Sequence, residues 1–571
     1  MAVGVASFHH SFRELVRACS SFYADNLESI NTEHVCQTRS KLSGFVRVFH
    51  EQCGTLTAVV NERLEDLKDR NCIVLMTAHQ PNFLPYSGVL RKATLNFLLA
   101  EKLEEALGIP VVNFFGIADQ DFSDDRWVRS CQLPAVERSG GIMTIEAKLP
   151  RNTMLNRVAK PSADSLRKWK AEIEKWVSDA TNSINRLLKT MGLAKDCGNI
   201  NSTILCKNLE SFWDIVEKCH DRCDNFADFN GFLLSKVVNE VWGYDTVFSR
   251  FSENQQAFCD DFNFLLSRFD EYSNLLRQSG EILGEPNNGG VSDQEFQLAP
   301  FWYHCDCGGK VKLFEKVEES FMVGEGNCSR CGRQYSLEFG TSNHPDISPL
   351  ASRVSARAVS MNLVFFRGLA PICYIGGAGG AAYLVQAQHV AQGLGILFPP
   401  VVVWRPHDKY LGVGQIEALL ELRQVCADLG ARDISEAKHS LVSKISAVYE
   451  SLDRIEKAKR RLIAELRKSP DDLELKERLR SVSISQTEMC RSSHLSVLHH
   501  TLKIIENVLS ISNLLPSMMD YAVNIGMKET SEEWIRHLNE KDSLESDVWL
   551  ESVLSKTQTL GSIFTEGLEL L

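Results

Sequence analysis

The sequence predicts an α/β protein in which a long insertion splits a parallel sheet into two halves. Residues 72–117 and 372–404 each read as strand, loop, helix and strand, and their strands are apolar runs without alternation. Such runs are typical of strands covered on both faces, and strand–helix–strand units build parallel sheets. Apolar residues from Leu441 to Leu466 recur in steps of four and three, which predicts a coiled-coil seam in a helix over 434–468. Ser469–Asp472 is expected to end this helix and cap a second one over 473–509, so the two form a long antiparallel hairpin.

The two halves of the predicted core can be followed along the chain. Cys72–Met76 predicts a strand, residues 77–88 predict a loop with two prolines, Val89–Leu107 predicts an amphipathic helix, and Ile109–Ile117 predicts a second strand. The second half repeats this order, with strands expected at 372–375 and 401–404 and a helix at 381–393. A further strand is expected at 246–251, inside the insertion.

Changes of pattern predict seven segments and a linker at 282–294. The segments are a helical N-terminal part (1–70), the first half of the core (71–126), a mainly helical connecting insertion (127–300), a small cysteine module (301–342), the second half of the core (343–430), the helical hairpin (431–512) and a helical C-terminal part (513–571).

Composition excludes several classes of protein. The chain has 571 residues, of which 44% are hydrophobic and 24% charged, so disordered and fibrous proteins are excluded. Its net charge of −12 disfavours nucleic acid as a partner, and the basic residues of the hairpin alternate with acids, as on a solvated helix face. An odd number of cysteines (17), scattered along the chain, favours a cytoplasmic protein with reduced thiols. Residues 368–404 lack charges, but glycines, glutamines and prolines interrupt them, so we expect no membrane span.

Four cysteines form the most specific local motif. Cys305 and Cys307 lie in C-x-C-G-G, and Cys328 and Cys331 lie in C-x-x-C-G. Two such knuckles are typical of a zinc ribbon, although the first pair is one residue shorter than usual. His304 could replace one sulfur, and four free thiols in a hairpin are the alternative. Four protein ligands would leave no vacant position, so we expect a structural Zn²⁺.

Three loops that follow predicted strands carry candidate functional residues. His79 follows the first strand, Asp119 and Asp121 follow the second, and the glycine run 376–380 follows the third. Ligands of open α/β sheets bind at the carboxyl ends of strands, so these loops predict one polar cleft. The alternatives are a turn histidine, capping aspartates and glycines that only allow close packing. The sequence contains no P-loop. No G-x-G-x-x-G follows the first strand, which disfavours a dinucleotide-dependent dehydrogenase.

At these loops the sequence resembles the BshC family, the cysteine-adding ligases of bacillithiol biosynthesis. Three blocks carry the resemblance: Thr77–Asp121 (TAHQPNFLPYSG through FFGIADQD), Ile347–Arg357 (ISPLASRVSAR), and Tyr374–Gln386 (YIGGAGGAAYLVQ) with the apolar strand that ends in Arg405. Together they span about 110 residues at both ends of the split core.

The resemblance implies a Rossmann-like core of the class I synthetase type, connecting insertions and a coiled coil through which two chains form a homodimer. It implies a reaction that condenses cysteine with glucosaminyl malate, with a nucleotide such as ATP on the enzyme. We assign the catalytic candidates His79, Gln80, Asp119 and Asp121. Candidates for binding substrate or nucleotide are Thr77, Tyr374, Gly376, Gly377, Gly379, Tyr383, Gln386 and Arg405.

Departures from the family pattern leave more than one function open. Gly380 stands where the family has Glu, Ala378 where it has Pro, and residues 120–123 read QDFS where the family has E-D-H-D. A zinc ribbon is not a usual feature of the family.

The first hypothesis is a carbon–nitrogen ligase that joins an amino acid, such as cysteine, to a small amine or aminosugar conjugate. In it, His79 and the loop amides would stabilise phosphate charge and Asp119 or Asp121 would orient an ammonium group. The second is a noncatalytic nucleotide-binding scaffold that recruits partners through the ribbon and hairpin, and the third is a nucleic-acid-linked protein.

Overall fold

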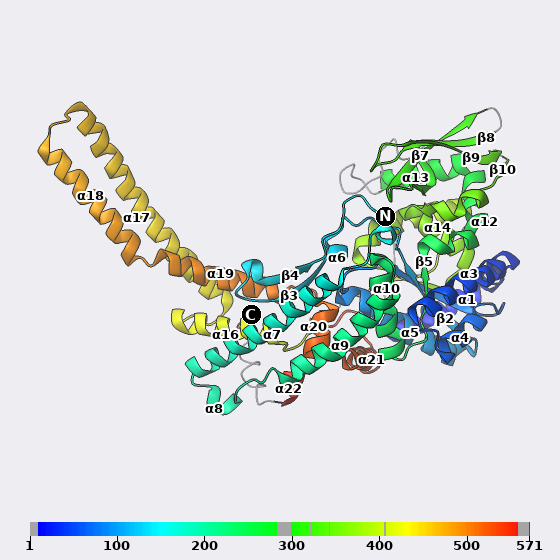
Figure 1. Cartoon of the computed structure of the whole chain (residues 1–571), viewed down its shortest axis with the longest axis horizontal. Coiled ribbons are helices and arrows are strands. Elements are labelled where there is room, and N and C mark those ends of the chain that lie inside the picture. Colours follow the sequence, from blue (N-terminus) through cyan, green and yellow to red (C-terminus); the bar gives the residue numbers. More distant parts are fainter. Residues whose placement is uncertain are drawn as a thin grey trace.

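A five-stranded parallel sheet forms the centre of the molecule, described here from a computed structural model (Figure 1). The structure describes residues 10–282, 298–318, 321–341, 343–404, 407–557 and 570, so the predicted linker at 282–294 lies almost wholly outside the described residues. The strands, in spatial order, are β5 (Val247–Arg250), β2 (Val111–Ile117), β1 (Ile73–His79), β12 (Cys373–Ile375) and β13 (Val401–Val402).

Both predicted halves contribute to this one sheet, because β1 pairs directly with β12. Leu75, Met76 and Thr77 lie opposite Cys373, Tyr374 and Ile375 in parallel register. Numbered along the chain, the strand order is 3-2-1-4-5, so the direction of winding reverses between β1 and β12. In open α/β sheets, ligands bind in the crevice at such a reversal, outside the carboxyl ends of the strands.

Successive strand residues are buried on opposite faces of the sheet. Leu75, Phe115 and Ile375 belong to one hydrophobic core, and Met76, Phe114 and Tyr374 belong to the other. The first core contains α5 (Ser87–Leu107), which ends at Gly108 in the left-handed conformation as expected. Helices α14 (Ala358–Leu369) and α15 (Ala381–Leu394) pack in the second.

The helical segments before and within the core occupy the expected parts of the chain. The N-terminal helices are α1 (Phe12–Asp25), α3 (Glu33–Cys53) and α4 (Ala58–Asp66). The insertion contains α7 (Ala163–Thr190), α9 (Thr203–Arg222), α10 (Phe226–Lys236), α12 (Cys259–Ser267), α13 (Phe269–Ile282) and the hairpin of β3 (Ser130–Pro134) and β4 (Ile142–Glu146).

The cysteine module belongs to a six-stranded antiparallel sheet that is larger than the sequence indicated. Its strands, in spatial order, are β10 (His344–Pro345), β9 (Gln334–Thr341), β8 (Phe321–Asn327), β7 (Lys310–Glu318), β6 (Leu298–His304) and β11 (Val354–Ala356). The edge strand β11 comes from beyond the predicted module and leads into α14, so the module is joined to the core by a paired strand.

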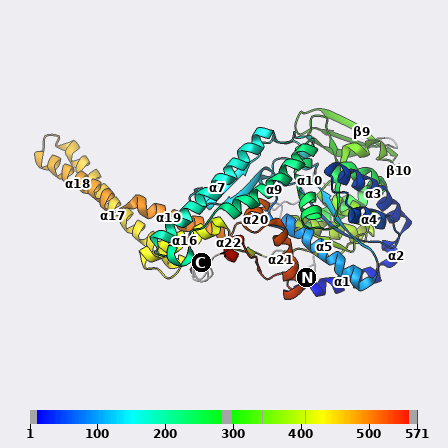
Figure 2. The ribbon, with the colours of Figure 1, turned by 60° about the horizontal axis from the view of Figure 1, so that its bottom comes forward.

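Two long helices form an arm that leaves the body at the end opposite to this sheet (Figures 1 and 2). They are α17 (Ile434–Lys468) and α18 (Leu473–Ser492), and Asp472 caps the second by accepting a hydrogen bond from the amide of Leu475 (3.0 Å). At 1.5 Å per residue, the 35 residues of α17 extend roughly 50 Å.

One helix expected at 473–509 is instead two helices, α18 and α19 (Leu495–Ser512). The break falls at His494, which has a φ of 48°, in the left-handed region. The hydroxyls of Ser492 and Ser493 donate to the carbonyls of Met489 and Cys490, in competition with helical bonds. The single-helix prediction was therefore wrong at this position.

The C-terminal part packs back on the body. It comprises α20 (Met518–Asn524), α21 (Met527–Lys541), α22 (Val553–Thr557) and β15 (Val548–Trp549). Strand β15 pairs with β14 (Asp408–Lys409), which precedes α16 (Val413–Leu429) at the end of the second half of the core. Within the described ranges, no helix is both long enough and apolar enough to cross a bilayer.

Candidate functional site

The carboxyl ends of β1 and β12, where the reversal of strand order predicts a crevice, hold a buried cation that the sequence analysis did not single out. Lys92 lies on α5 and is only 9% exposed, and its Nζ donates to the carbonyl of Ala78 at the end of β1 (3.0 Å). Burial lowers the pKa of Lys92 to about 8, so the side chain is still largely protonated at neutral pH.

Lys92 also reaches the glycine loop that follows β12. A Cβ added at Gly377 would lie 3.2 Å from the Lys92 Nζ, so the ammonium group sits against this backbone. The first and third predicted loops are thus brought together, on either side of one lysine. The sequence signal that could have found it was the pair of bases Arg91 and Lys92 in the apolar first half of this helix.

The glycines of this loop are not needed for an unusual backbone conformation or for free amide groups. Gly376, Gly377, Gly379 and Gly380 all have ordinary φ values, so their freedom to adopt positive φ is not used. The amide of Gly376 donates to Val402 (2.9 Å) and that of Gly380 to Gly377 (3.1 Å), and both are therefore occupied within the protein. What the loop requires is the absence of a side chain at Gly377, because Lys92 fills that space.

His79 is a neutral hydrogen-bonding group in this structure. Its Nδ1 lies 3.0 Å from the carbonyl of Gln80, which can only accept, so Nδ1 carries the proton and Nε2 the lone pair. The hydroxyl of Tyr86 lies 3.4 Å from Nε2. Burial, together with the charge of Lys92, lowers the pKa of His79 to about 3. In this tautomer Nε2 can accept a hydrogen bond, as it does from the Tyr86 hydroxyl, and cannot donate one to a phosphate.

Asp119 is held by the neighbouring strand connection. Its carboxylate accepts hydrogen bonds from the amide (2.8 Å) and hydroxyl of Ser252, just after β5, and from Asn156 (3.3 Å). Burial raises the pKa of Asp119 to about 6, although the hydrogen bonds from Ser252 act to lower it. The arrangement ties the ends of β2 and β5 together and leaves little of the carboxylate for a ligand.

Asp121 faces the cysteine module instead of the glycine loop. Its Oδ1 lies 3.8 Å from the Nζ of Lys310, a buried residue at the start of β7. The ammonium of Lys310 also lies 5.1 Å from the ring centroid of Phe122. The module therefore contacts the loop after β2, a connection that sequence spacing did not reveal.

The remaining candidates take up different positions. The Thr77 hydroxyl donates to the carbonyl of Ile375 (2.8 Å) and so bridges β1 and β12. Tyr374 is buried against Phe366, while Tyr383 is 39% exposed on α15 and Gly379 is exposed beside it. Arg405 lies outside the described residues.

Several buried polar groups at this edge of the sheet have no hydrogen-bond partner in the described part of the chain. They are both side-chain polar atoms of Asn82, Oε1 of Gln120, Nε2 of Gln386 and Nε1 of Trp404. Each follows the carboxyl end of β1, β2, β12 or β13. Such atoms also occur elsewhere, for example in Asn31 and Ser273, so at this edge they mark positions that a polar ligand or ordered water could complete.

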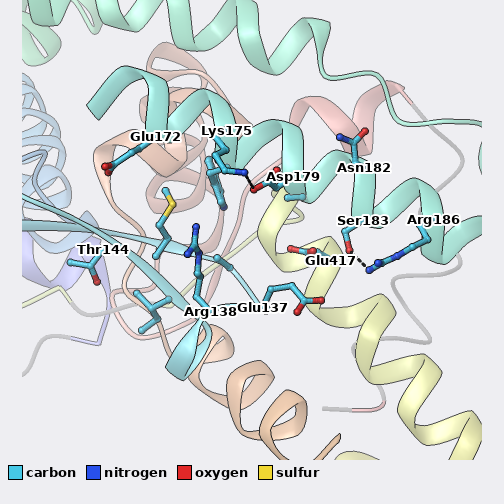
Figure 3. Close-up of a pocket in the computed structure, with 15 residues that line it drawn as sticks. Glu137, Arg138, Thr144, Glu172, Lys175, Asp179, Asn182, Ser183, Arg186 and Glu417 are labelled. Atoms are coloured by element: carbon cyan, nitrogen blue, oxygen red, sulfur yellow. Dashed lines mark hydrogen bonds and ion pairs between the residues drawn. The ribbon is translucent and has the colours of Figure 1, made fainter. Parts of the chain in front are cut away.

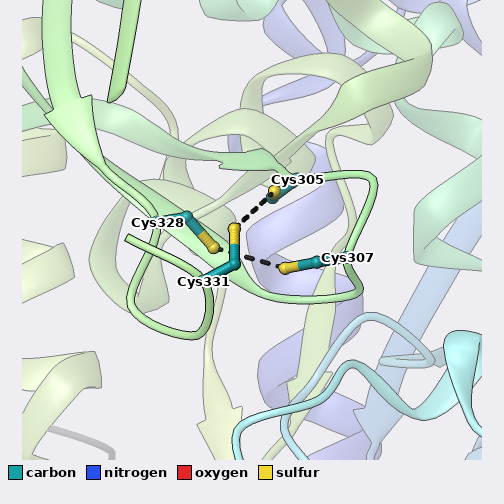
Figure 4. Close-up of side chains that lie close together, drawn as sticks. All are labelled: Cys305, Cys307, Cys328 and Cys331. Carbon is teal, nitrogen blue, oxygen red and sulfur yellow. Dashed lines mark hydrogen bonds between the residues drawn. The ribbon is translucent and has the colours of Figure 1, made fainter. Parts of the chain in front are cut away.

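The four cysteines of the module form a separate candidate metal centre (Figure 4). Their sulfur atoms all lie within 4.8 Å of one another, with Cys305 3.6 Å from Cys331 and Cys307 3.5 Å from Cys328. Thiolates around a tetrahedral Zn²⁺ at ~2.3 Å would be spaced by roughly 3.8 Å, so the group could hold a metal ion.

The backbone around the cysteines supports the same interpretation. The amides of Gly309 and Arg330 each point to a sulfur at 3.4 Å, and a Cβ at Gly309 would lie 2.8 Å from the sulfur of Cys328. His304 is turned away and pairs with the hydroxyl of Ser355 (2.8 Å), so it does not join the cluster.

Comparisons with known proteins give one consistent set of relatives. No family model matches the chain. Proteins named "Putative cysteine ligase BshC" from Bacillus cereus strains G9842 and B4264 are each 23% identical to it, over 342 residues (60% of this chain) and 403 residues (70%). A protein of the same name from Bacillus thuringiensis strain Al Hakam is 23% identical over 345 residues. The aligned regions span 56%, 67% and 56% of these relatives' own lengths. The chain is thus distantly related to proteins named as cysteine ligases of the BshC type.

Proposed function

We propose that the chain is a nucleotide-dependent carbon–nitrogen ligase of the BshC type, acting in bacillithiol or a similar thiol-cofactor biosynthesis. It joins an amino acid, such as cysteine, to a small amine or aminosugar conjugate. The observation that carries the proposal is the buried Lys92 ammonium between the end of β1 and Gly377, at the point where the order of the parallel strands reverses.

The residues of the crevice fit an anionic nucleotide. A charged lysine held between the end of β1 and the backbone of Gly377 offers a phosphate a cation. The unpaired polar atoms of Asn82 and Gln386 would give a base or a sugar its hydrogen bonds. ATP, when bound, would supply the activation of the carboxylate that amide formation in water requires.

The chain's own residues would position the reactants. Lys92 would hold the phosphate charge, and Nε2 of His79 would accept a hydrogen bond from the ligand. Asp121 is half-buried, and among the described residues its cation partner is Lys310 at 3.8 Å, so its carboxylate is less occupied than that of Asp119 and would be the one to hold an ammonium group. In this proposal Asp119 keeps the loop in shape.

The assay for this proposal offers ATP, cysteine and a panel of aminosugar conjugates to the purified protein and follows products by mass spectrometry. We expect an amide product that requires both ATP and cysteine. If the protein binds ATP but forms no product with any amino acid and amine, the noncatalytic scaffold is favoured. Two features support that alternative: Gly380 replaces the glutamate of the family, and the carboxylate of Asp119 already accepts hydrogen bonds within the protein. Absence of ATP binding would contradict both.

We also propose that the arm is an antiparallel coiled coil through which two chains dimerise. Ile445 and Leu462 on α17 are buried, whereas α18 buries no residue and leaves Leu473 and Ile484 78% and 49% exposed. One hairpin thus covers only part of its apolar surface, and a second copy would cover the rest.

A further inference from the structure

A cavity of about 900 Å³ lies well away from the crevice, between α7, the β3–β4 hairpin and α16 (Figure 3). Its polar lining includes Glu137 and Arg138 from the hairpin turn, Lys175 and Arg186 from α7, and Glu417 from α16. None of its lining residues comes from a loop that follows β1, β2, β12 or β13. Its size is that of a small-molecule site.

Glu417 is the most unusual residue of this lining. It is only 4% exposed, yet it lines the cavity, and no cation pairs with it in the described part of the chain. Figure 3 shows its carboxyl group between Ser183 on α7 and Glu137 on the turn. Burying a carboxylate without a cation is unfavourable, and a ligand with positive charge would offset that cost.

The rest of the lining leaves the cavity short of positive charge. Lys175 and Asp179 pair with each other (2.7 Å). Arg186 reaches Ser183 (3.1 Å) and Glu421 (3.8 Å), which lies one turn beyond Glu417. The lining groups without an ion-pair partner among the described residues are the acids Glu137, Glu172 and Glu417 and the base Arg138. A ligand that balances this set carries positive charge.

We propose that this cavity binds a small organic amine, whose ammonium group pairs with Glu417 and Glu137. The indole of Trp176 lines the same cavity, and its Nε1 donates to the carbonyl of Pro134 (2.8 Å), which holds the ring in place. An aromatic ring in this position can attract a cation through its face. The proposal stands independently of the ligase function, since it shares no residue with the crevice.

The protonation state of Glu417 makes the proposal measurable. Burial, with the nearby charges of Glu137 and Glu421, raises its pKa to about 7, against the hydrogen bond from Ser183 and the charge of Arg186. An ammonium group binds the carboxylate form, so affinity should rise between about pH 6 and pH 8, and binding near pH 6 should release a proton.

The test is calorimetric titration of the full chain with putrescine, using the uncharged 1,4-butanediol as the matched probe. We expect putrescine to bind and butanediol to give no heat. Glu417→Gln should weaken putrescine binding about tenfold or more and abolish its pH dependence, because a charge-assisted hydrogen bond is lost. Glu174→Gln removes the same charge from an exposed position of α7 that does not line the cavity, and should change nothing.

Glu137→Gln, at an exposed position, provides a second variant should the buried substitution impair folding, and we expect it to weaken binding roughly threefold. Three results would overturn the proposal: no putrescine binding up to about 10 mM, equal binding of putrescine and butanediol, or equal affinity in the Glu137, Glu174 and Glu417 variants.

Discussion

The close contact between Lys92 and Gly377 predicts a matched pair of glycine variants. In Gly377→Ala the new methyl group would lie 3.2 Å from the Lys92 Nζ and displace it, whereas a Cβ at Gly379 meets nothing within 4 Å. We expect Gly377→Ala to weaken ATP binding by roughly fivefold, about 1 kcal/mol, and Gly379→Ala to leave it unchanged. Fluorescence titration with a labelled ATP analogue measures both. Equal ATP affinities in the two variants would show that Lys92 does not contribute to nucleotide binding.

Glu417 makes a second prediction at the residue scale, for stability. Its folded pKa of about 7 lies above the value near 4.5 of an unfolded chain, so ionising it costs stability. That cost is absent below about pH 4.5 and complete above about pH 7. Glu417→Gln should therefore stabilise the protein by roughly 1–3 kcal/mol at pH 8 and have little effect near pH 5. Urea unfolding at the two pH values checks this, and a destabilised variant at pH 8 would contradict it.

Residue types at strand ends could be predicted from the sequence, but their partners could not. The four cysteines could be predicted to cluster because their spacing along the chain is typical of a zinc ribbon, and their sulfur atoms do lie together. Lys92 was missed because its importance depends on how α5 packs across β1, which no local pattern records. The engagement of Asp119 by Ser252 was missed for the same reason, since 133 residues separate them.

Among the elements, the cysteine module yields the clearest prediction. We expect one Zn²⁺ per chain after gel filtration, and we expect Cys328→Ser to lose it. Because metal binding contributes to folding, this variant should unfold at a temperature lower by roughly 5 °C or more. Cys490→Ser, at an exposed position of the arm, is the control and should keep its zinc. Metal analysis below about half an equivalent in the reduced wild-type protein would refute the site.

The boundaries of elements show where local sequence is sufficient. Gly108 and Asp472 begin or end helices where expected, because their caps depend on adjacent residues alone. The break at His494 was missed, since serine hydroxyls can bond to a helix carbonyl without ending the helix. The strand β11 joined the cysteine sheet only through a pairing with β6, distant in sequence.

At the scale of the whole molecule, the arm predicts the oligomeric state. Light scattering at micromolar concentration should give twice the 64.2 kDa mass of one chain. A variant with Ile484→Glu on α18 and Val497→Glu on the adjoining α19, at positions 49% and 57% exposed, should shift the equilibrium to the monomer. Glu477→Gln, also exposed on the arm, should leave the dimer intact. A wild-type monomer at high concentration would reject the arm as an interface.

Because the two distant halves of the chain join in one sheet, Lys92 lies between the loops that would bind the nucleotide. The most direct measurement is calorimetric titration of ATP into the wild-type protein and the Lys92→Met variant, which keeps the length of the side chain and removes its charge. We predict that the wild type binds one ATP and that the variant binds it at least about tenfold more weakly, as expected for the loss of a charged hydrogen bond. Equal affinities, or no binding by the wild type, would contradict a nucleotide site between β1 and β12.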